Sequence, residues 1–292
     1  MASSLIEDSW TGDDVSIAEI ERELARLRVA TAQEDQQPNL RTSVMTHIAW
    51  VPLEWQTAAE ETLLGMAERH PSRTLLLVPK PDEEDGLDAQ LSIRCFPVGD
   101  RAICGEVIEL FMRGNRAAAP ASLALPLLIS DLPVFLRWRG RPPFGSPELD
   151  QMVGITDRLI VDSTEWGDVT ECYPHLVDLF DRTAVSDIAW ARTERWRSLL
   201  ASLWPGIAEV KEMTVHGTPA QAHLLAGWLR SRLHHDVTVN VDVHETLEGI
   251  DLDGEATPFP PGDPPHPSDV LSSELDSFGR NRVYEAAVRA AT

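Results

Sequence analysis

The sequence predicts an α/β fold with a mixed β-sheet and flanking helices, organised as two α/β domains or subdomains. Apolar runs typical of strands alternate along the chain with segments of helical periodicity, and two of the strands form a hairpin. The 292 residues suffice for one large domain or two smaller ones. Because 43% of the residues are hydrophobic, the chain can bury a sizeable core.

The first half of the chain contains an amphipathic helix, a linker and most of the predicted strands. Apolar residues recur at three- and four-residue steps from Ile17 to Leu27, which predicts a helix over 16–29. A polar linker follows at 31–39, and Gly99-Asp100 predicts a two-residue type II′ hairpin turn. We expect strands at 42–51, 74–78, 87–95, 103–112, 134–138 and 158–161, and helices at 56–69 and 117–130.

The second half combines helices with two further strands. Thr218 and Gln221 form a capping box with proline between them, which predicts a helix from 218 to 233. Six prolines at 258–267 predict an extended tether. The other expected elements are helices at 171–181, 190–204 and 270–290, and strands at 210–215 and 237–243.

These elements divide the chain into four parts. Residues 1–40 form an N-terminal helix and linker, and residues 41–166 form an N-terminal α/β domain. Residues 167–257 form a C-terminal α/β domain, and residues 258–292 form the proline-rich tether and C-terminal helix.

Composition and motif spacing lower the odds of several functions. The 47 acidic and 25 basic residues give a net charge of −22, which repels phosphate backbones and anionic lipid, so we expect neither nucleic-acid nor membrane binding. The sequence has no G-x-G, no phosphate-binding loop, no G-x-S-x-G and no standard zinc spacing. We therefore expect no cofactor and no metal. No secretory signal or membrane span is visible, which favours the cytoplasm.

Several blocks occur in an order that points to a family. They are Arg69-His-Pro-Ser-Arg73, Ile103-Cys-Gly-Glu-Val107, Asp131-Leu-Pro-Val-Phe-Leu-Arg-Trp-Arg-Gly140, Asp157-Arg-Leu-Ile-Val-Asp-Ser163, and Ser186-Asp-Ile-Ala-Trp-Ala-Arg192 running into Trp196-Arg-Ser-Leu-Leu200. This ordered set resembles the glucose-6-phosphate dehydrogenase assembly proteins, the OpcA family, over residues 40–290.

The resemblance implies a non-catalytic protein that binds glucose-6-phosphate dehydrogenase and promotes its active oligomeric state, at the entry to the oxidative pentose phosphate pathway. We expect allosteric activation through selective binding of the active quaternary state. The alternative is a sugar-phosphate-binding enzyme or metabolite sensor that uses Arg69, Arg73 and the strand end at Asp162.

Arginine and tryptophan in these blocks are candidates for contact with the partner, because both are enriched at interface hot spots. The candidate partner-binding residues are Arg137, Trp138, Arg139, Asp157, Arg158, Asp162, Asp187, Trp190, Arg192 and Trp196. A core position is the favoured interpretation for Trp138 and Trp196, whereas Arg137 and Arg192 are evenly balanced between the two. For Asp157, Arg158 and Asp162 a structural ion pair and cap is favoured.

Three further clusters have a functional and a structural interpretation. Arg69, His70 and Arg73 could bind an anion, although a solvated helix end is favoured. Counting outward from the hairpin turn places Cys95 opposite Cys104, close enough for a redox-switchable disulfide. Two reduced thiols are favoured because the cytoplasm is reducing. The last cluster is His234, His235, Asp236, Asp242 and His244, for which a solvated face is favoured over a metal site.

Overall fold

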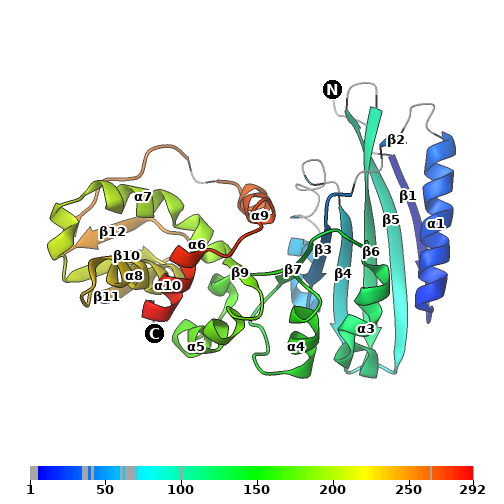
Figure 1. Cartoon of the computed structure of the whole chain (residues 1–292), viewed down its shortest axis with the longest axis horizontal. Helices are drawn as coiled ribbons and strands as arrows, with labels where there is room; N and C mark the ends of the chain where they lie inside the picture. Colours follow the sequence, from blue (N-terminus) through cyan, green and yellow to red (C-terminus); the bar gives the residue numbers. More distant parts are fainter. Residues whose placement is uncertain are drawn as a thin grey trace. The chain divides into compact units, whose positions relative to one another are not determined.

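The computed structural model describes residues 6–34, 39–40, 43–59, 62, 70, 72–98, 101–263 and 265–291. The chain forms two compact units, Met1–Leu159 and Ile160–Thr292 (Figure 1). Mixed sheets with flanking helices confirm the predicted α/β class. The four-part division at 40/41, 166/167 and 257/258 stays a prediction. No helix among the described residues has the length and apolar character needed to cross a membrane.

The N-terminal unit is built on a mixed sheet with the strand order β1-β5-β6-β4-β3-β7, and β2 pairs with β6. The neighbours β6, β4, β3 and β7 are parallel, whereas β5 is antiparallel to both β1 and β6. The strands are β1 (Ile6–Gly12), β2 (Asn39–Leu40), β3 (Thr46–Trp50), β4 (Arg73–Lys80), β5 (Gly86–Val98), β6 (Arg101–Arg113) and β7 (Val134–Trp138).

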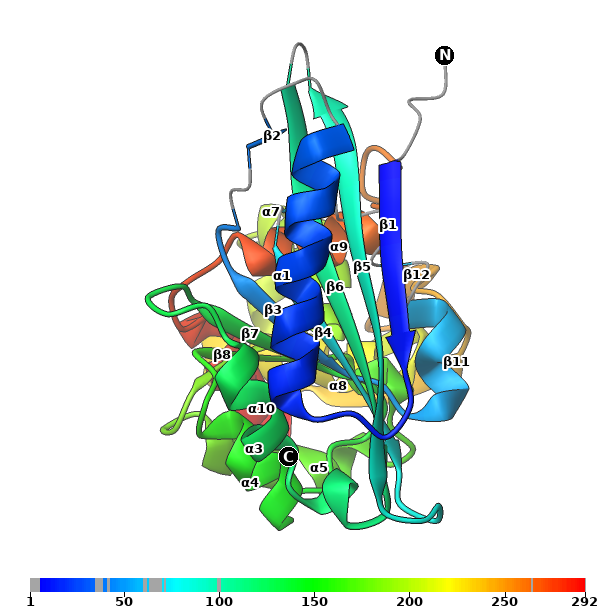
Figure 2. The same ribbon diagram turned by 90° about the vertical axis from the view of Figure 1, so that its right-hand side faces the viewer.

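Helix α1 (Ile17–Glu34) packs across the antiparallel part of this sheet (Figure 2). Its predicted stripe is buried, with Ile20, Leu24 and Leu27 no more than 2% exposed. Arg28 on the same helix forms two hydrogen bonds to Glu106 of β6. The predicted amphipathic helix therefore docks with its apolar stripe onto the sheet of its own unit.

The other helical segments of this unit whose bounds the structure describes are short. They are η1 (Leu53–Trp55), η2 (Gly114–Ala118), α3 (Pro120–Ala124), η3 (Leu125–Leu127) and α4 (Pro147–Val153). The single helix predicted over 117–130 is wrong, because this segment contains two prolines. Pro120 begins α3, and Pro126, which lacks an amide donor, lies in η3, the 3₁₀ turn in which the helix ends. Residues 56–59 and 62 of the helix predicted over 56–69 are helical, and the rest lie outside the described residues, as does the turn at Gly99-Asp100.

The C-terminal unit contains a second, four-stranded sheet in the order β11-β10-β12-β13. Strands β10 and β11 are parallel, and the remaining pairs are antiparallel. The elements from the boundary onward are β8 (Arg158–Val161), η4 (Ser163–Glu165), α5 (Val169–Leu179), β9 (Ala184–Asp187), α6 (Ile188–Arg192), α7 (Glu194–Ser202), η5 (Gly206–Glu209), β10 (Glu212–Gly217), α8 (Pro219–Leu233), β11 (Thr238–Val243), β12 (Gly249–Leu252), β13 (Glu255–Ala256), α9 (Pro267–Leu275) and α10 (Arg282–Ala291).

Helix α8 covers one face of this sheet and packs against α10. The predicted capping box between Thr218 and Gln221 is present, with both reciprocal hydrogen bonds. A glycine is required at position 227, because a Cβ there would lie 2.1 Å from the carbonyl oxygen of Ala287 on α10. The absence of a side chain therefore lets the two helix backbones approach closely.

Two predicted helices are divided in the structure. The helix expected at 190–204 becomes α6 and α7, because the hydroxyl of Thr193 bonds back to the carbonyl of Trp190 and ends the first segment. The helix expected at 270–290 becomes α9 and α10, and the side chain of Asn281 caps the second by accepting from the amide of Tyr284.

Candidate functional site

A groove of about 1020 Å³ lies at the carboxyl ends of the parallel strands of the N-terminal sheet. Trp50, Lys80 and Trp138 are the last residues of β3, β4 and β7 and line the groove, as does Gly114, which follows β6. Ligand sites in open α/β sheets form outside the carboxyl ends of parallel strands. This groove is therefore the first candidate for a binding site.

Aromatic and charged side chains line the groove. The rings of Trp50 and Trp138 stack with centroids 4.6 Å apart, and the guanidinium of Arg139 lies 4.5 Å from the ring centroid of Trp55. Acidic groups outnumber basic ones in the lining: Glu54, Asp82, Glu83, Asp85 and Glu148 against Lys80, Arg139 and Arg141. Such a mixed lining suits a polar surface of a partner better than a bare anion.

Most of the residues predicted to contact a partner are buried. Trp138, Trp190 and Trp196 are core residues, as favoured for Trp138 and Trp196, and Arg137 also lies inside, where it donates to the carbonyl of Trp138. The other buried members of the set are Arg158, Asp162 and Asp187. A buried side chain can act on a partner only through the surface groups that it supports.

The remaining three, Arg139, Asp157 and Arg192, reach the surface at least in part. Asp157 also has a structural role, because its carboxylate accepts from the amide of Val134 at 2.8 Å. The partner-binding role of the whole set stays a prediction.

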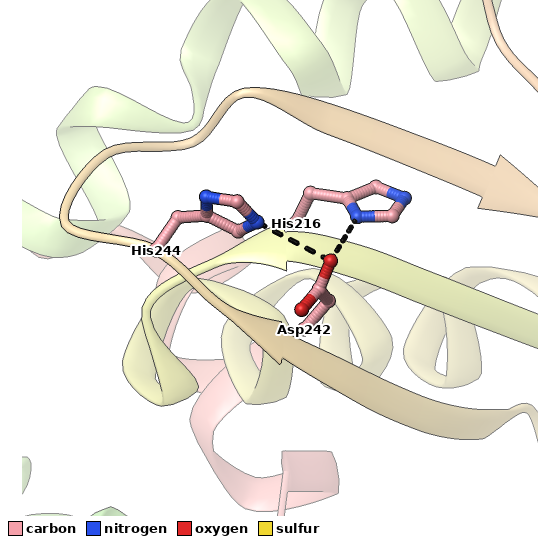
Figure 3. A group of neighbouring side chains, drawn as sticks. All are labelled: His216, Asp242 and His244. Atoms are coloured by element: carbon pink, nitrogen blue, oxygen red, sulfur yellow. Dashed lines mark hydrogen bonds and ion pairs between the residues drawn. The ribbon is translucent and has the colours of Figure 1, made fainter.

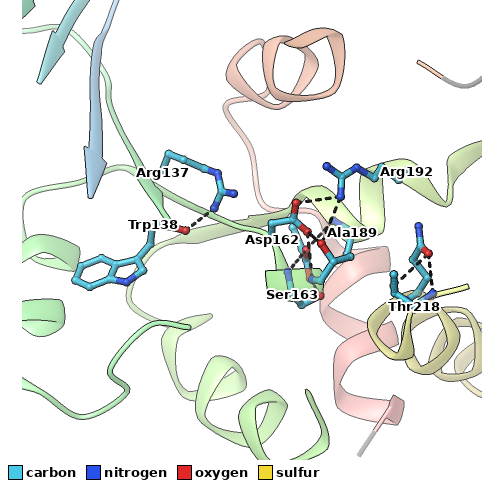
Figure 4. A network of polar contacts seen from close by, with 10 residues as sticks. Arg137, Trp138, Asp162, Ser163, Ala189, Arg192 and Thr218 are labelled. Atoms are coloured by element: carbon cyan, nitrogen blue, oxygen red, sulfur yellow. Dashed lines mark hydrogen bonds and ion pairs between the residues drawn. The ribbon is translucent and has the colours of Figure 1, made fainter. Parts of the chain in front are cut away.

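In the C-terminal unit, Asp162 holds Arg192 in place (Figure 4). The carboxylate of Asp162 accepts from Arg192 Nη1 at 3.0 Å and from the hydroxyl of Thr164 at 2.6 Å. It also accepts from the Thr164 amide and so caps η4. The favoured ion pair and cap at Asp162 is therefore present, although its cation is Arg192 rather than Arg158. The side chain of Arg192 remains 35% exposed.

Asp187 is the centre of a buried hydrogen-bond network next to Asp162. It accepts from the amide and hydroxyl of Ser163, at 3.0 and 2.6 Å, and from the amide of Ala189, at 2.9 Å. The hydroxyl of Tyr284 also donates to it, at 3.4 Å. Burial, reinforced by the negative charge of Asp162, raises the pKa of Asp187 to about 7.

This network joins a serine to a carboxylate, but its geometry serves the fold. Ser163 is fully buried, and its hydroxyl donates directly to Asp187 rather than to a histidine base. Asp187 caps the start of α6, the short helix that ends at Arg192. The buried carboxylates therefore fix the helix that carries the exposed arginine.

A second groove, of about 880 Å³, lies beside Arg192. Arg195 Nη2 donates to the carbonyl of Pro260 at 2.9 Å, and the rings of Trp196 and Phe259 lie 5.9 Å apart. The segment predicted as an extended tether thus packs along α7 and forms one wall of this groove. Phe259 itself is 76% exposed.

The predicted anion-binding cluster is only partly described. Arg69 lies outside the described residues, and His70 is buried. The guanidinium of Arg73 donates to Glu106 at 2.9 Å and to the carbonyl of Leu127 at 2.7 Å. Because Arg73 is engaged within the fold, the structure offers no support for an anion at this position.

The two cysteines of the β5–β6 hairpin are joined. The register pairs Cys95 with Cys104, as the count from the turn predicted, and their sulfur atoms form a disulfide with a Cα–Cα distance of 4.1 Å. The favoured interpretation of two reduced thiols therefore differs from the structure. It rested on a reducing compartment and on a possible slip of register, and the register does not slip. A redox-switching role stays a prediction.

The histidine cluster differs in membership from the one considered in the sequence. Asp242 and His244 are joined by His216 of β10, which the sequence analysis did not consider (Figure 3). His234, His235 and Asp236 follow α8 and are not part of this group. His216 belongs to this cluster because it is the direct register partner of Asp242 in the pairing of β10 with β11. Strand neighbours of this kind cannot be read from spacing along the chain.

Comparison with known families connects both units to one protein. Residues 65–177 match the model described as the glucose-6-phosphate dehydrogenase subunit N-terminal domain, and residues 183–258 match that of the C-terminal domain of the same subunit. The chain belongs to the OpcA family. The resemblance inferred from the ordered blocks is thereby confirmed.

Similar proteins named as OxPP cycle protein OpcA occur in three cyanobacteria. The chain is 30% identical over 182 residues to that of Nostoc punctiforme, covering 58% of this chain and 39% of that protein. Identity is 28% over 183 residues with Synechococcus elongatus and 25% over 182 residues with Synechocystis sp., covering 58% of this chain and 41% and 38% of those proteins. The matched part spans about two fifths of each relative's length. No solved structure matches the chain.

Proposed function

We propose that this chain is a non-catalytic assembly factor and allosteric activator of glucose-6-phosphate dehydrogenase, acting in the cytoplasm on the oxidative pentose phosphate pathway. The match of both domain models of one dehydrogenase subunit to this chain carries the proposal. The burial of Ser163 in the Asp187 network supports a non-catalytic role, since its hydroxyl is turned into the fold. Activation follows if the chain binds the active quaternary state more tightly than the inactive one.

We further propose that the surface around Arg192 contacts the dehydrogenase. The buried carboxylates of Asp162 and Asp187 hold Arg192 and the start of its helix, so the guanidinium is oriented before binding. Exposed Phe259 provides apolar area at the adjoining groove. A fixed arginine beside an aromatic side chain is typical of interface hot spots.

The test mixes the purified chain with the dehydrogenase and follows NADP reduction and co-elution on a sizing column. We expect co-elution and activation with the wild type, and about tenfold weaker binding with Arg192→Gln, the effect of losing about 1.4 kcal/mol at a hot spot. Arg232→Gln, on the exposed end of α8, is the matched control and should bind like the wild type. Circular dichroism checks that both variants are folded.

Failure of the wild type to bind at micromolar concentrations would contradict the proposed function. Equal binding by Arg192→Gln and the wild type would remove only the proposed surface. The alternative, a sugar-phosphate enzyme or sensor, predicts that the isolated chain converts or binds a sugar phosphate. Arg73 and Asp162 already have partners within the fold, so neither of these two described residues favours this alternative.

A further inference from the structure

The four-stranded sheet of the C-terminal unit has one apolar and one polar face. Side chains alternate along a strand, so Met213 and Val215 of β10 lie in the core, whereas Thr214 and His216 lie on the opposite face. Asp242 on β11 and Asp251 on β12 belong to this polar face too. The sheet thereby gathers ionisable side chains from three strands on one surface.

We propose that His216, Asp242 and His244 bind a divalent first-row transition-metal ion such as Zn²⁺ (Figure 3). One donor atom from each of the three residues lies within 4.8 Å of the others. Asp242 Oδ2 is 2.9 Å from His216 Nδ1 and 3.2 Å from His244 Nε2. Two ligands bound tetrahedrally at about 2.1 Å stand about 3.4 Å apart. Both Asp242–imidazole distances lie within about half an ångström of this spacing, and the donor atoms of the two imidazoles lie within 4.8 Å of each other.

The outward nitrogen of each imidazole is held by a second carboxylate. His216 Nε2 lies 3.1 Å from Asp251 Oδ2, and His244 Nδ1 lies 3.3 Å from Glu248 Oε2. Histidine ligands of metal sites characteristically bond a carboxylate through their other ring nitrogen, which fixes the tautomer and the ring orientation. Two histidines that both show this arrangement distinguish the cluster from an incidental surface ion pair.

The backbone around the cluster also holds the ligands in position. The amide of His244 donates to the carbonyl of Gly217 at 3.1 Å, and the amide of Glu248 donates to the carbonyl of His216 at 2.8 Å. Gly249 lies opposite His216, and a Cβ there would come within 3.1 Å of the imidazole ring. The glycine therefore leaves room for the ring above β12.

The donor set selects the class of metal. Imidazole nitrogen suits Zn²⁺, Co²⁺ and Ni²⁺, whereas Mg²⁺ and Ca²⁺ prefer oxygen ligands throughout. Three carboxylates, those of Asp242, Glu248 and Asp251, surround the two imidazoles and favour a cation. His216 and His244 keep 30% and 36% of their side-chain surface exposed, which leaves a path for the ion.

Zinc titration of the full-length chain tests the site. We expect one Zn²⁺ per chain, at least a hundredfold weaker binding in His216→Ala and His244→Ala, and about tenfold weaker binding in Asp251→Asn. The matched control, His234→Asn, removes an exposed histidine outside the cluster and should leave the affinity unchanged. A large excess of Mg²⁺ should not displace the zinc.

Nuclear magnetic resonance of the histidine ring nitrogens provides a second readout on the wild type, which does not depend on how the variants fold. Zn²⁺ should shift the signals of His216 and His244. Shifts confined to His234 and His235, undiminished binding in both alanine variants, displacement by Mg²⁺, or no detectable binding of Zn²⁺ in the titration would each overturn the proposal.

Discussion

The pKa of Asp187 differs strongly from that of an exposed aspartate, because its carboxylate is buried. It is 1% exposed, and four donors from Ser163, Ala189 and Tyr284 surround its carboxylate. The hydrogen bonds favour the ionised form, but burial and the neighbouring Asp162 outweigh them and raise the pKa to about 7. Much of the Asp187 population is therefore protonated near neutral pH.

This raised pKa makes the stability of the protein depend on pH. An unfolded aspartate titrates near pH 3.9, so the folded state binds the proton more tightly and gains stability that is fully present below about pH 4. The gain is lost as the pH rises towards 7, and a shift of about three units corresponds to about 4 kcal/mol. Asp187→Asn keeps a neutral group of the same size and should remove this loss.

Urea unfolding of the wild type and Asp187→Asn at pH 4.5, 6 and 8 measures the effect. We expect the wild type to lose about 3 kcal/mol more than the variant across this range, because part of the gain is already lost at pH 4.5. The other carboxylates are common to both proteins, so the difference reports on Asp187 together with its coupling to Asp162. Parallel stability curves for the two proteins would contradict the raised pKa.

Sequence reasoning identified these residues but not their environment. Asp162 and Asp187 were predicted from the chemistry of strand ends and a family block, and both are placed at strand ends in the structure. The sequence could not show that Arg192, which donates to Thr164 at a separation of 28 residues, would also pair with Asp162, since both contacts depend on tertiary packing. For the same reason it left Arg137 evenly balanced, whereas packing buries it.

At the scale of elements, period-two alternation and a two-residue turn motif were sufficient to predict the β5–β6 hairpin. Each residue pairs as the count from the turn predicts, including Cys95 with Cys104. Helix boundaries were less predictable, because local hydrogen bonds by Thr193 and Asn281 divide segments whose hydrophobic pattern is continuous. The sequence did not predict strand β1 (Ile6–Gly12), because this segment is mostly polar and forms a strand through its pairing with β5.

The disulfide should stabilise this hairpin measurably. Cys95 and Cys104 are nine residues apart, and closing a loop of that size in the unfolded chain is worth roughly 2–3 kcal/mol. Replacing both cysteines by serine should lower the free energy of unfolding by about this amount. Reductant should lower the melting temperature of the wild type and leave the double variant unchanged, and a wild type that does not respond to reductant would contradict the bond.

At the scale of the whole molecule, two units of α/β structure could be expected from the order of elements along the chain. Their sheet topologies could not be predicted in this way. Strand β4 pairs with β3, its neighbour in sequence, but also with β6, which is not its neighbour in sequence. The histidine cluster shows the consequence for sites: His216 meets Asp242 through parallel pairing across an intervening helix, α8. Sites assembled from neighbouring strands become visible only once the strand order is known.

Net charge is a property of the whole chain, and it predicts how stability responds to salt. With 47 acidic and 25 basic residues, repulsion between like charges opposes the compact state. The screening length falls from about 30 Å at 0.01 M salt to about 8 Å at 0.15 M, which removes long-range repulsion while contact pairs such as Arg28–Glu106 persist. Sodium chloride should therefore raise the melting temperature at pH 7.5 by a few degrees.

The same titration at pH 4.7, near the isoelectric point, is the control and should show little change. A melting temperature that falls with salt at pH 7.5 would mean that short-range ion pairs outweigh the net repulsion.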